Sequence, residues 1–207
     1  MFLKSGRTAA TLLLAATIVL SLASCATMSP EECKSANWRD VGHRDGLNGK
    51  PLSLLSTRAS DCAESNVRVD NAAYLKGRDA GLRNFCQPEN AAQFGLNGGN
   101  YEGVCPPQID GEFRRHFQLG RNVYVYRSEV NQIDSSIQSK EQRLRTLDRD
   151  ENKRVRDANN EDDRRRARKD IDDERRRIRN ELRDLERNLR RARDNLRDAE
   201  WAMDRVR

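Results

Sequence analysis

Residues 171–206 read IDDERRRIRNELRDLERNLRRARDNLRDAEWAMDRV, and this stretch decides the fold. Apolar side chains recur in it at alternating spacings of three and four residues. The positions on one such seam are Ile171, Arg175, Ile178, Leu182, Leu185, Leu189, Ala192, Leu196, Ala199, Met203 and Val206. Only Arg175 among them is not apolar. A sustained repeat of this kind predicts a long coiled-coil helix with a charged outer face.

A second seam of the same kind lies earlier in the chain. Its positions are Val123, Tyr126, Val130, Ile133, Ile137, Lys140, Leu144 and Leu147, and only Lys140 is not apolar. After Gly120 the sequence contains neither glycine nor proline, the two residues that most strongly interrupt a helix. We expect Asp110 to cap the start of this helix.

The two seams are out of phase, and the segment between them, 148–170, is nearly all charged. An antiparallel hairpin accounts for both facts. Pairing Ile137 with either Leu185 or Ile178 places the turn within 157–163, where helix propensity is poorest. The predicted arms have roughly 45 residues each and are about 65–70 Å long.

The hairpin prediction has one alternative, and it implies a position for the end of the chain. The alternative structure is one continuous helix with a stammer, which pairs with another chain. The consequence is that Trp201 returns to the level of Phe117 and Arg121, where it would dock the end of the tail on the preceding domain.

The preceding stretch, residues 30–120, is rich in glycine and contains a short internal repeat. The pattern G-x-x-x-G-L occurs at 42–47 and at 77–82, and Gly-Leu-Asn-Gly occurs at 46–49 and at 95–98. We predict three or four short helices, at about 31–47, from the cap Asp70 to Cys86, and at about 89–96.

Glycines four residues apart share one helix face, and we expect them to allow close helix packing. The alternative is a ligand cleft lined by Arg44, Asp45, Arg78 and Asp79. Charged side chains of this kind more commonly form a solvated face.

Four cysteines lie in this stretch: Cys33, Cys62, Cys86 and Cys105. An even number in an exported chain predicts two disulfides, for which three connectivities are possible. The sequential pairing closes the smallest loops and is preferred. A zinc site is disfavoured because zinc ligands come in closely spaced pairs, which these cysteines do not form.

The amino-terminal residues have the layout of a secretory signal peptide. Lys4 and Arg7 precede an apolar run at 8–20, which is short for a membrane span, and Leu-Ala-Ser-Cys follows at 22–25. This sequence resembles the lipobox of bacterial lipoproteins. The resemblance implies cleavage after residue 24, a lipid-modified Cys25 and attachment to a membrane. The residue after Cys25 is Ala26 and not Asp. By resemblance to lipoprotein sorting in enterobacteria, this implies delivery to the outer membrane, with the protein facing the periplasm.

A second resemblance covers roughly residues 33–121. After a Cys–Trp–G-x-x-x-G–Cys arrangement come Tyr74-x-x-Gly77-x-x-x-Gly81-Leu82-x-x-Phe85-Cys86 and Gly98-x-x-Tyr101-x-x-Val104-Cys105-Pro106. This set resembles domain of unknown function 2799, an uncharacterised family of proteobacterial lipoproteins. The resemblance implies an envelope location and disulfides, and it assigns no activity and no catalytic residues.

Composition limits the function. Of 207 residues, 36% are hydrophobic and 35% charged, which is too polar for one large core. Residues 149–207 contain 21 basic and 17 acidic side chains, a balance that favours ion pairs along a solvated helix over phosphate binding, so no nucleic-acid partner is expected. His43 and His116 lie outside any recognisable catalytic motif. We expect neither an enzyme nor a cofactor or metal.

The sequence therefore predicts an all-α protein in four parts. These are a lipoprotein signal peptide (1–24), a lipidated linker (25–29), a disulfide-stapled helical domain (30–120) and a coiled-coil tail (121–207). The expected function is that of a lipid-anchored envelope protein that projects the coiled coil into the periplasm, toward an envelope protein or a second copy. The alternative is a module in 30–120 that binds a small ligand or a peptidoglycan fragment, with the tail as a spacer.

Overall fold

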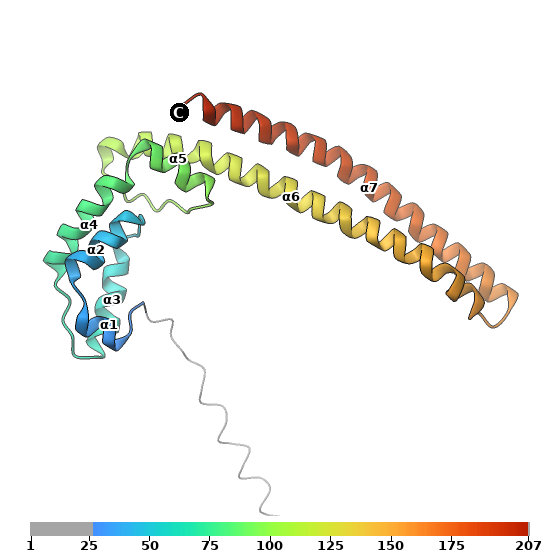
Figure 1. The fold of residues 1–207 in the computed structure, drawn as a ribbon, viewed down its shortest axis with the longest axis horizontal. Coiled ribbons are helices and arrows are strands. Elements are labelled where there is room, and N and C mark those ends of the chain that lie inside the picture. Colours follow the sequence, from blue (N-terminus) through green and yellow to red (C-terminus); the bar gives the residue numbers. More distant parts are fainter. Residues whose placement is uncertain (1–26, 207) are drawn as a thin grey trace, which may run out of the picture.

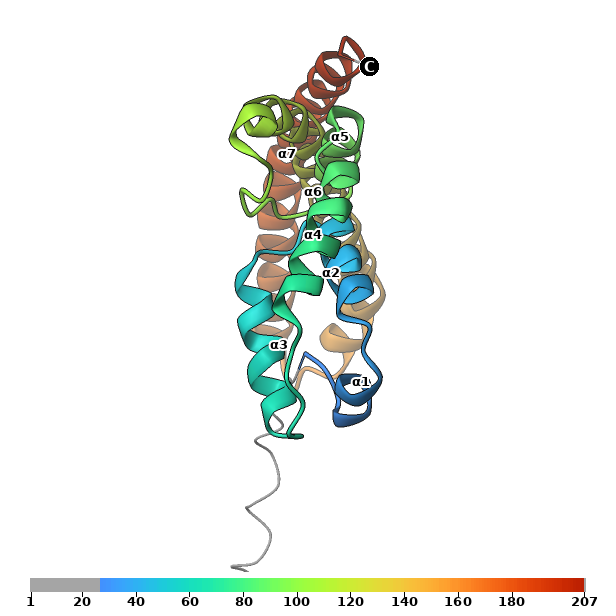
Figure 2. The same ribbon diagram turned by 90° about the vertical axis from the view of Figure 1, so that its left-hand side faces the viewer.

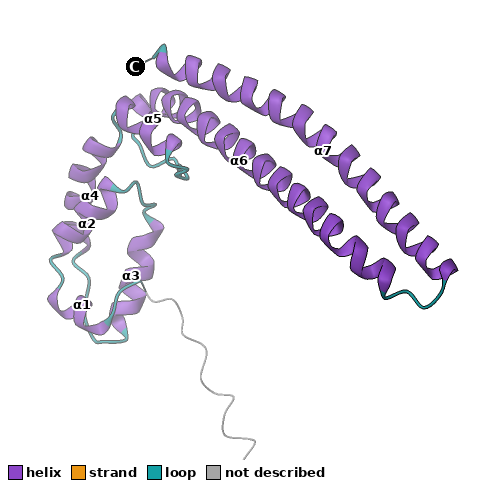
Figure 3. Ribbon diagram, turned by 45° about the vertical axis from the view of Figure 1, so that its right-hand side comes forward, coloured by secondary structure: helices purple, strands orange, loops and turns teal. Residues whose placement is uncertain are grey.

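The computed structural model describes residues 27–206, which are helical apart from short connections (Figure 3). Seven helices follow one another in this range: α1 (Pro30–Ser35), α2 (Trp38–Leu47), α3 (Ser53–Ala63), α4 (Asn71–Phe85), α5 (Pro88–Leu96), α6 (Pro107–Arg156) and α7 (Glu161–Asp204). A small domain built from α1–α5 and the start of α6 leads into a long antiparallel pair, α6 and α7 (Figure 1). The all-α prediction and the predicted hairpin are both confirmed.

The short helices match the prediction in part. Asp70 caps α4 by accepting a hydrogen bond from the backbone N–H of Ala73, and α5 also begins and ends where expected. The single helix predicted at 31–47 is wrong. The side chain of Asn37 accepts hydrogen bonds from two backbone N–H groups of the following turn, and this cap starts α2 as a separate helix. α3 was not predicted, and its start has no side-chain cap.

The same helix crossing occurs twice in the domain. α2 packs on α4 through Gly46 and Gly81, and α5 packs on α6 through Gly95 and Gly120. A side chain on any of these four glycines would overlap main-chain atoms of the partner helix. The glycines therefore serve close helix packing, as expected from their spacing.

The turn after the first helix of each pair is also repeated. Gly49 and Gly98 have φ values of 61° and 78°, a region that glycine enters without strain. The ring of Phe85 covers Gly49, and the ring of Tyr124 covers Gly98. The repeated Gly-Leu-Asn-Gly sequence thus marks two equivalent helix pairs. We call them the first unit (α2 and α4) and the second unit (α5 and the start of α6).

Each unit has its own disulfide within an apolar core, and the core of the second unit also includes Leu82 and Phe85 of α4. Cys33–Cys62 lies in a core with Trp38 and Tyr74, and Cys86–Cys105 lies in a core with Phe113. Each bridge joins the chain before the first helix of a unit to the connection between its two helices. The structure therefore has the sequential pairing, with Cα–Cα distances of 5.4 and 5.7 Å.

α6 belongs to both parts of the molecule. Phe113 and Val123, near its start, are 1% and 0% exposed, and the helix then continues without a break to Arg156. The boundary predicted between residues 120 and 121 lies inside this helix. Asp110 does not cap it, because the helix begins earlier, at Pro107, which suits a first helical position.

The hairpin turns at 157–160, within the predicted segment, and Asn160 caps α7. The turn lies at the end of the hairpin farthest from the domain (Figures 1 and 2). Every predicted seam position is buried or half-buried except Val206. The heptad pattern therefore identified the packed face of both helices.

The docking of Trp201 on the domain is a wrong prediction. Its side chain is 63% exposed, and the guanidinium of Arg205 stacks over its ring, 4.7 Å from the centroid. Met203, two residues later and on the seam, is buried instead. Val206 lines a cleft of about 270 Å³ beside α5 and the start of α6, so the end of the chain approaches the domain without Trp201.

Candidate functional site

A charged cluster lies in the core of the first unit. Asp45, in α2, is only 6% exposed. Its carboxylate accepts two hydrogen bonds from Arg58 of α3, from Nε at 3.0 Å and from Nη2 at 2.9 Å. It also accepts a hydrogen bond from the hydroxyl of Tyr74, in α4, at 2.7 Å. One carboxylate thus joins three helices.

Tyr74 is the most deeply buried member of this cluster. Its side chain is 0% exposed, and burial together with the neighbouring carboxylate of Asp45 raises the pKa of its hydroxyl well above the ordinary value of 10. The hydroxyl therefore stays protonated and remains a hydrogen-bond donor to Asp45.

Arg78 adds a second cation to the first unit. It is 8% exposed, and its Nη2 donates to the carbonyl oxygen of Lys50 at 2.9 Å. The N–H of Lys50 in turn donates to the carbonyl oxygen of Asp45 at 2.9 Å, so Arg78 braces the turn that follows α2. Within residues 27–206 the buried Nε of Arg78 has no hydrogen-bond partner.

The second unit carries aromatic rings where the first carries these polar groups. Counting from the packed glycines of each helix pair, Phe94 takes the place of Asp45, Phe113 that of Tyr74, and Phe117 that of Arg78. The three rings lie in one core, with centroids of Phe94 and Phe117 6.1 Å apart. The helix pair can therefore form around an apolar core, and the buried charges of the first unit are not demanded by the fold.

The predicted ligand cleft is not formed by its four residues. Asp45 and Arg78 are buried and bind the protein's own groups, whereas Arg44 and Asp79 are exposed. For Asp45 and Arg78 the solvated-face interpretation is wrong as well. The sequence carried a signal for this outcome, since aligning the two Gly-Leu-Asn-Gly stretches places Asp45 over the aromatic Phe94.

Arg58 was not among the residues that the sequence singled out. Besides holding Asp45, it donates from Nη1 to the carbonyl oxygen of Thr27 at 3.3 Å. Asp61, one helical turn further along α3, also binds Thr27. No motif marks these contacts, because they join residues more than thirty positions apart.

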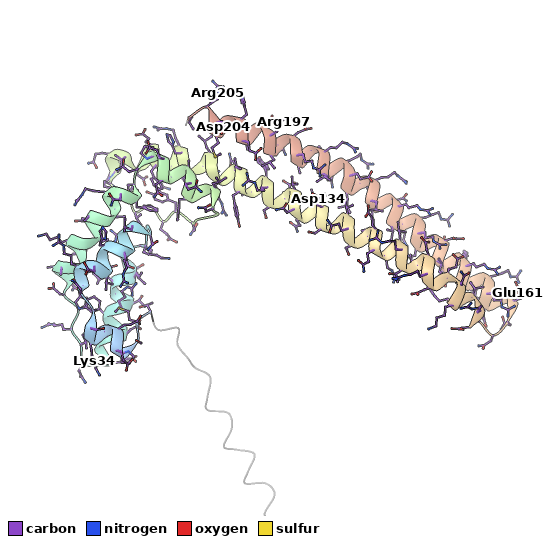
Figure 4. The ribbon with its side chains drawn as sticks, viewed as in Figure 1. Lys34, Asp134, Glu161, Arg197, Asp204 and Arg205 are labelled. Carbon is purple, nitrogen blue, oxygen red and sulfur yellow. A yellow bond between two sulfur atoms is a disulfide. The ribbon has the colours of Figure 1, made fainter. Side chains whose placement is uncertain are left out.

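The hairpin surface is covered with charges along its length. Ion pairs between the two helices include Arg127–Glu200 (3.0 Å), Arg193–Asp134 (3.5 Å), Lys140–Glu181 (2.5 Å) and Arg143–Glu174 (2.7 Å). Figure 4 shows Asp134 along the hairpin and Glu161 at its far end. Exposed pairs of this kind contribute little to stability, and they leave a solvated outer face.

Arg175 is the exception on this surface. It occupies a seam position and its side chain is only 14% exposed. It binds Glu151 and Asp148 of α6, both at 2.7 Å, and Asp172 of its own helix at 3.3 Å. The hydrogen bonds that Arg175 donates to Glu151 and Asp148 raise the pKa of its guanidinium further above its ordinary value, so the charge on Arg175 is permanent.

The remaining predicted features are the lipidation residue, the two histidines, and the absence of a metal site. Cys25 lies outside the described residues. His43 and His116 lie in different units, His43 in α2 and His116 in α6. Across residues 27–206, no cluster of His, Cys, Asp and Glu side chains is suited to hold a metal ion, and no helix is long and apolar enough to cross a membrane. The two disulfides indicate an extracytoplasmic protein.

Comparison with known families assigns the domain. Residues 37–122 match the family model of DUF2799, described as a protein of unknown function. This part of the chain is a DUF2799 domain. No curated protein and no solved structure matches the chain.

The limits of the DUF2799 match agree with the fold. It starts at Asn37, the cap of α2, and ends two residues after Gly120, the glycine at which α5 and α6 pack. It thus covers both units of the DUF2799 domain and leaves out the hairpin beyond residue 122 and the segment that contains Thr27 and Cys33. The hairpin is an extension of the second helix of the second unit.

Proposed function

We propose that the protein is a lipid-anchored envelope protein without catalytic activity, in which the DUF2799 domain is a rigid base and the hairpin is an arm that binds another envelope protein. The observation that carries the proposal is the continuity of α6. Its first turns are core of the domain, and the same helix runs on as one side of the hairpin. Movement of the base is therefore transmitted to the tip.

The surface of the hairpin suits an arm. Most of its apolar side chains pack between α6 and α7, and its exposed face consists largely of charged residues, with Tyr124, Val125 and Trp201 as exposed apolar side chains. Forty-four residues of α7 correspond to about 66 Å of helix. A pair of helices of this length is far more than a small domain needs for stability, and reach is the property that it supplies.

The lipid anchor and the location rest on other features. Leu-Ala-Ser-Cys at 22–25 supports lipid modification of Cys25, and the two disulfides support an oxidising compartment. Ala26 supports delivery to the outer membrane. Mass spectrometry of the mature amino terminus tests the anchor, and a Cys25→Ser variant should remain unprocessed and leave the outer-membrane fraction.

A photo-crosslinking amino acid at Asn159 tests the arm in living cells. Asn159 is exposed in the turn, whereas Asn160 is unsuitable because its side chain caps α7. We expect a discrete crosslink to a second envelope protein. A probe at the exposed Leu52, in the domain, is the matched control and should not form the same product. Crosslinks to a second copy alone would replace the proposed partner by self-association.

Shortening the arm separates reach from surface chemistry. Deleting 137–150 and 171–184 removes two heptads from each helix, keeps the seams in phase and the turn intact, and shortens the arm by about 21 Å. We expect the crosslink from Asn159 to disappear. Filling the gaps with second copies of 123–136 and 185–198 restores the length with a different surface and should restore the crosslink. A shortened arm that still forms it would show that reach is not required.

A further inference from the structure

Thr27, the first described residue, is held by three hydrogen bonds to α3. Its backbone N–H and its hydroxyl both donate to Oδ2 of Asp61, at 2.7 and 2.6 Å. Its carbonyl oxygen accepts from Nη1 of Arg58 at 3.3 Å. Thr27 is itself exposed, so apolar burial does not explain why its main chain is fixed.

The residues that follow Thr27 are fixed as well. Met28 is 8% exposed and packs in the core of the first unit with Trp38. Ser29 caps α1 in a reciprocal arrangement with Glu32. Residues 27–29 therefore belong to the folded domain and do not serve as a free linker.

The two side chains that hold Thr27 belong to a rigid support. Arg58 is fixed from its other side by the buried Asp45, and the bridge between Cys33 and Cys62 ties α3 to α1. In the second unit Tyr101 takes the place of Arg58, each lying four residues before the second cysteine of its bridge. Tyr101 binds the carboxylate of Asp110, which also pairs with the exposed Arg114. The buried pair of Asp45 and Arg58 thus belongs to the unit that receives the amino-terminal segment.

Chain geometry relates this contact to the membrane. Cys25 precedes Thr27 by two residues, so their Cα atoms are separated by at most about 7.6 Å. The headgroup layer on each side of a bilayer is roughly 5–8 Å thick. A lipid on Cys25 therefore leaves the surface formed by Thr27, Arg58 and Asp61 in reach of the headgroups and without slack to move away.

We infer that Asp61 and Arg58 form a clamp on Thr27 that seats this surface of the domain directly on the lipid headgroups and so fixes the orientation of the hairpin relative to the bilayer. The inference rests on the proposed lipid anchor. α1, with Lys34, lies at the end of the domain remote from the root of the hairpin, and Glu161 lies at the tip (Figures 1 and 4). The path from the seat to the tip runs from α3 through Asp45 to Tyr74 of α4. Phe85, at the end of α4, shares a core with Phe113 of α6, and α6 continues without a break to Arg156.

Hydrogen exchange of the full lipoprotein, in vesicles of phosphatidylethanolamine and phosphatidylglycerol, tests the clamp. The backbone amide of Thr27 should exchange slowly, and an Asp61→Ala variant should speed its exchange about ten-fold or more, because a hydrogen bond to a charged group is lost. Peptides from α4 should not change. Glu64→Ala removes an exposed carboxylate at the end of the same helix and is the matched control. An unprotected Thr27 amide in the wild-type protein would overturn the clamp.

Energy transfer from a fluorescent amino acid at Asn159 to a headgroup acceptor tests the seating. The wild-type protein should give one narrow distribution of distances, and Asp61→Ala a broad one. Six Gly and Ser residues inserted between Ala26 and Thr27 should broaden the distribution while leaving the Thr27 amide protected, since the clamp is intact but the tether is long. Equal distributions in all three proteins would overturn the inference.

The same samples distinguish this failure from that of the proposed anchor. A wild-type protein that does not bind vesicles, and whose Cys25 carries no lipid by mass spectrometry, would refute the anchor and the seating. Protection of the Thr27 amide would still report the clamp in that case.

Discussion

Asp45 and Phe94 occupy the same position in two equivalent helix pairs, each directly before the glycine at which its helix crosses the partner. Asp45 is buried and binds Arg58 and Tyr74, whereas Phe94 packs among other aromatic rings. The chain thus contains two versions of one structure, one with a polar core and one with an apolar core. Their comparison separates what the fold requires from what the first unit adds.

Asp45→Ala should destabilise the first unit strongly. It leaves the Tyr74 hydroxyl and the guanidinium of Arg58 without their acceptor, and breaking a buried pair in this way costs about 3–5 kcal/mol. Urea denaturation followed by circular dichroism measures the loss. Asp79→Ala, an exposed carboxylate in α4, is the control and should stay within about 0.5 kcal/mol of the wild type.

Replacing both members of the pair should cost less than replacing one. In an Asp45→Leu, Arg58→Leu double variant no buried charge is left without a partner, as is true of the aromatic core of the second unit. We expect a free energy of unfolding above that of Asp45→Ala. A double variant less stable than the single one would mean that the fold itself needs the charges.

The glycine crossings give a matched pair of substitutions. A Cβ at Gly77 would overlap the carbonyl oxygen of Arg39 in the main chain of α2, which cannot move aside cheaply, so Gly77→Ala should lower stability by at least about 3 kcal/mol. Gly111 is exposed in α6, and the nearest atom to its Cβ position is 4.0 Å away. Gly111→Ala should therefore raise stability by about 0.5–1 kcal/mol. Thermal denaturation of both variants checks the contrast.

The hairpin could be predicted because its information is local and periodic. The seams of α6 and α7 and the weak propensity of 157–163 fixed the paired faces and the turn. The two helices meet along those faces whatever the rest of the chain does. The separate helix α2 was missed because one side-chain cap, at Asn37, outweighed a continuous helical pattern.

The buried charges could not be predicted in the same way. Arg44, Asp45, Arg78 and Asp79 have similar surroundings in the sequence, and only the crossing of α2 and α4 decides which two are buried. Arg58 and Asp61 were invisible for a related reason, since their partner Thr27 lies at the far end of a connection that only tertiary structure closes. Trp201 stays exposed because it lies beside the seam, whose position near the end of α7 is occupied by Met203.

Arg175 should be replaceable at lower cost by a large apolar residue than by a small one. Arg175→Ala leaves the carboxylates of Asp148, Glu151 and Asp172 facing one another without a cation, and should lower hairpin stability by about 1–3 kcal/mol. Arg175→Leu leaves the same carboxylates without a cation but completes the apolar seam, and should therefore recover part of the loss. Arg176→Ala removes an exposed arginine paired only within its own helix and should change little. The three melting curves, followed by circular dichroism, decide among these outcomes.

The disulfides should stabilise the two units separately. Replacing Cys86 and Cys105 by serine should lower the free energy of unfolding by about 3 kcal/mol, because the unfolded chain is no longer constrained. Exchange should increase in the core around Phe113 and remain slow around Tyr74. The corresponding change at Cys33 and Cys62 should have the opposite distribution. A loss of protection throughout the domain in either variant would show that the two units unfold as one.

Alkaline pH should destabilise the domain through the buried Tyr74 and the half-buried Tyr101. Burial, and the hydrogen bond donated to Asp110, raise the pKa of Tyr101 to about 12, and Tyr74 is shifted in the same direction by burial and Asp45. A tyrosine of the unfolded chain loses its proton near pH 10, so the unfolded state binds fewer protons above that pH and the free energy of unfolding falls. The contribution of Tyr101 is complete below pH 10 and is lost as the pH rises to about 12. Tyr101→Phe and Tyr74→Phe should each reduce the slope of stability against pH in this window by a similar amount, because each hydroxyl keeps its proton in the folded state there. Urea denaturation at pH 8, 10 and 11 measures the slopes, and an unchanged slope in both variants would contradict the assignment.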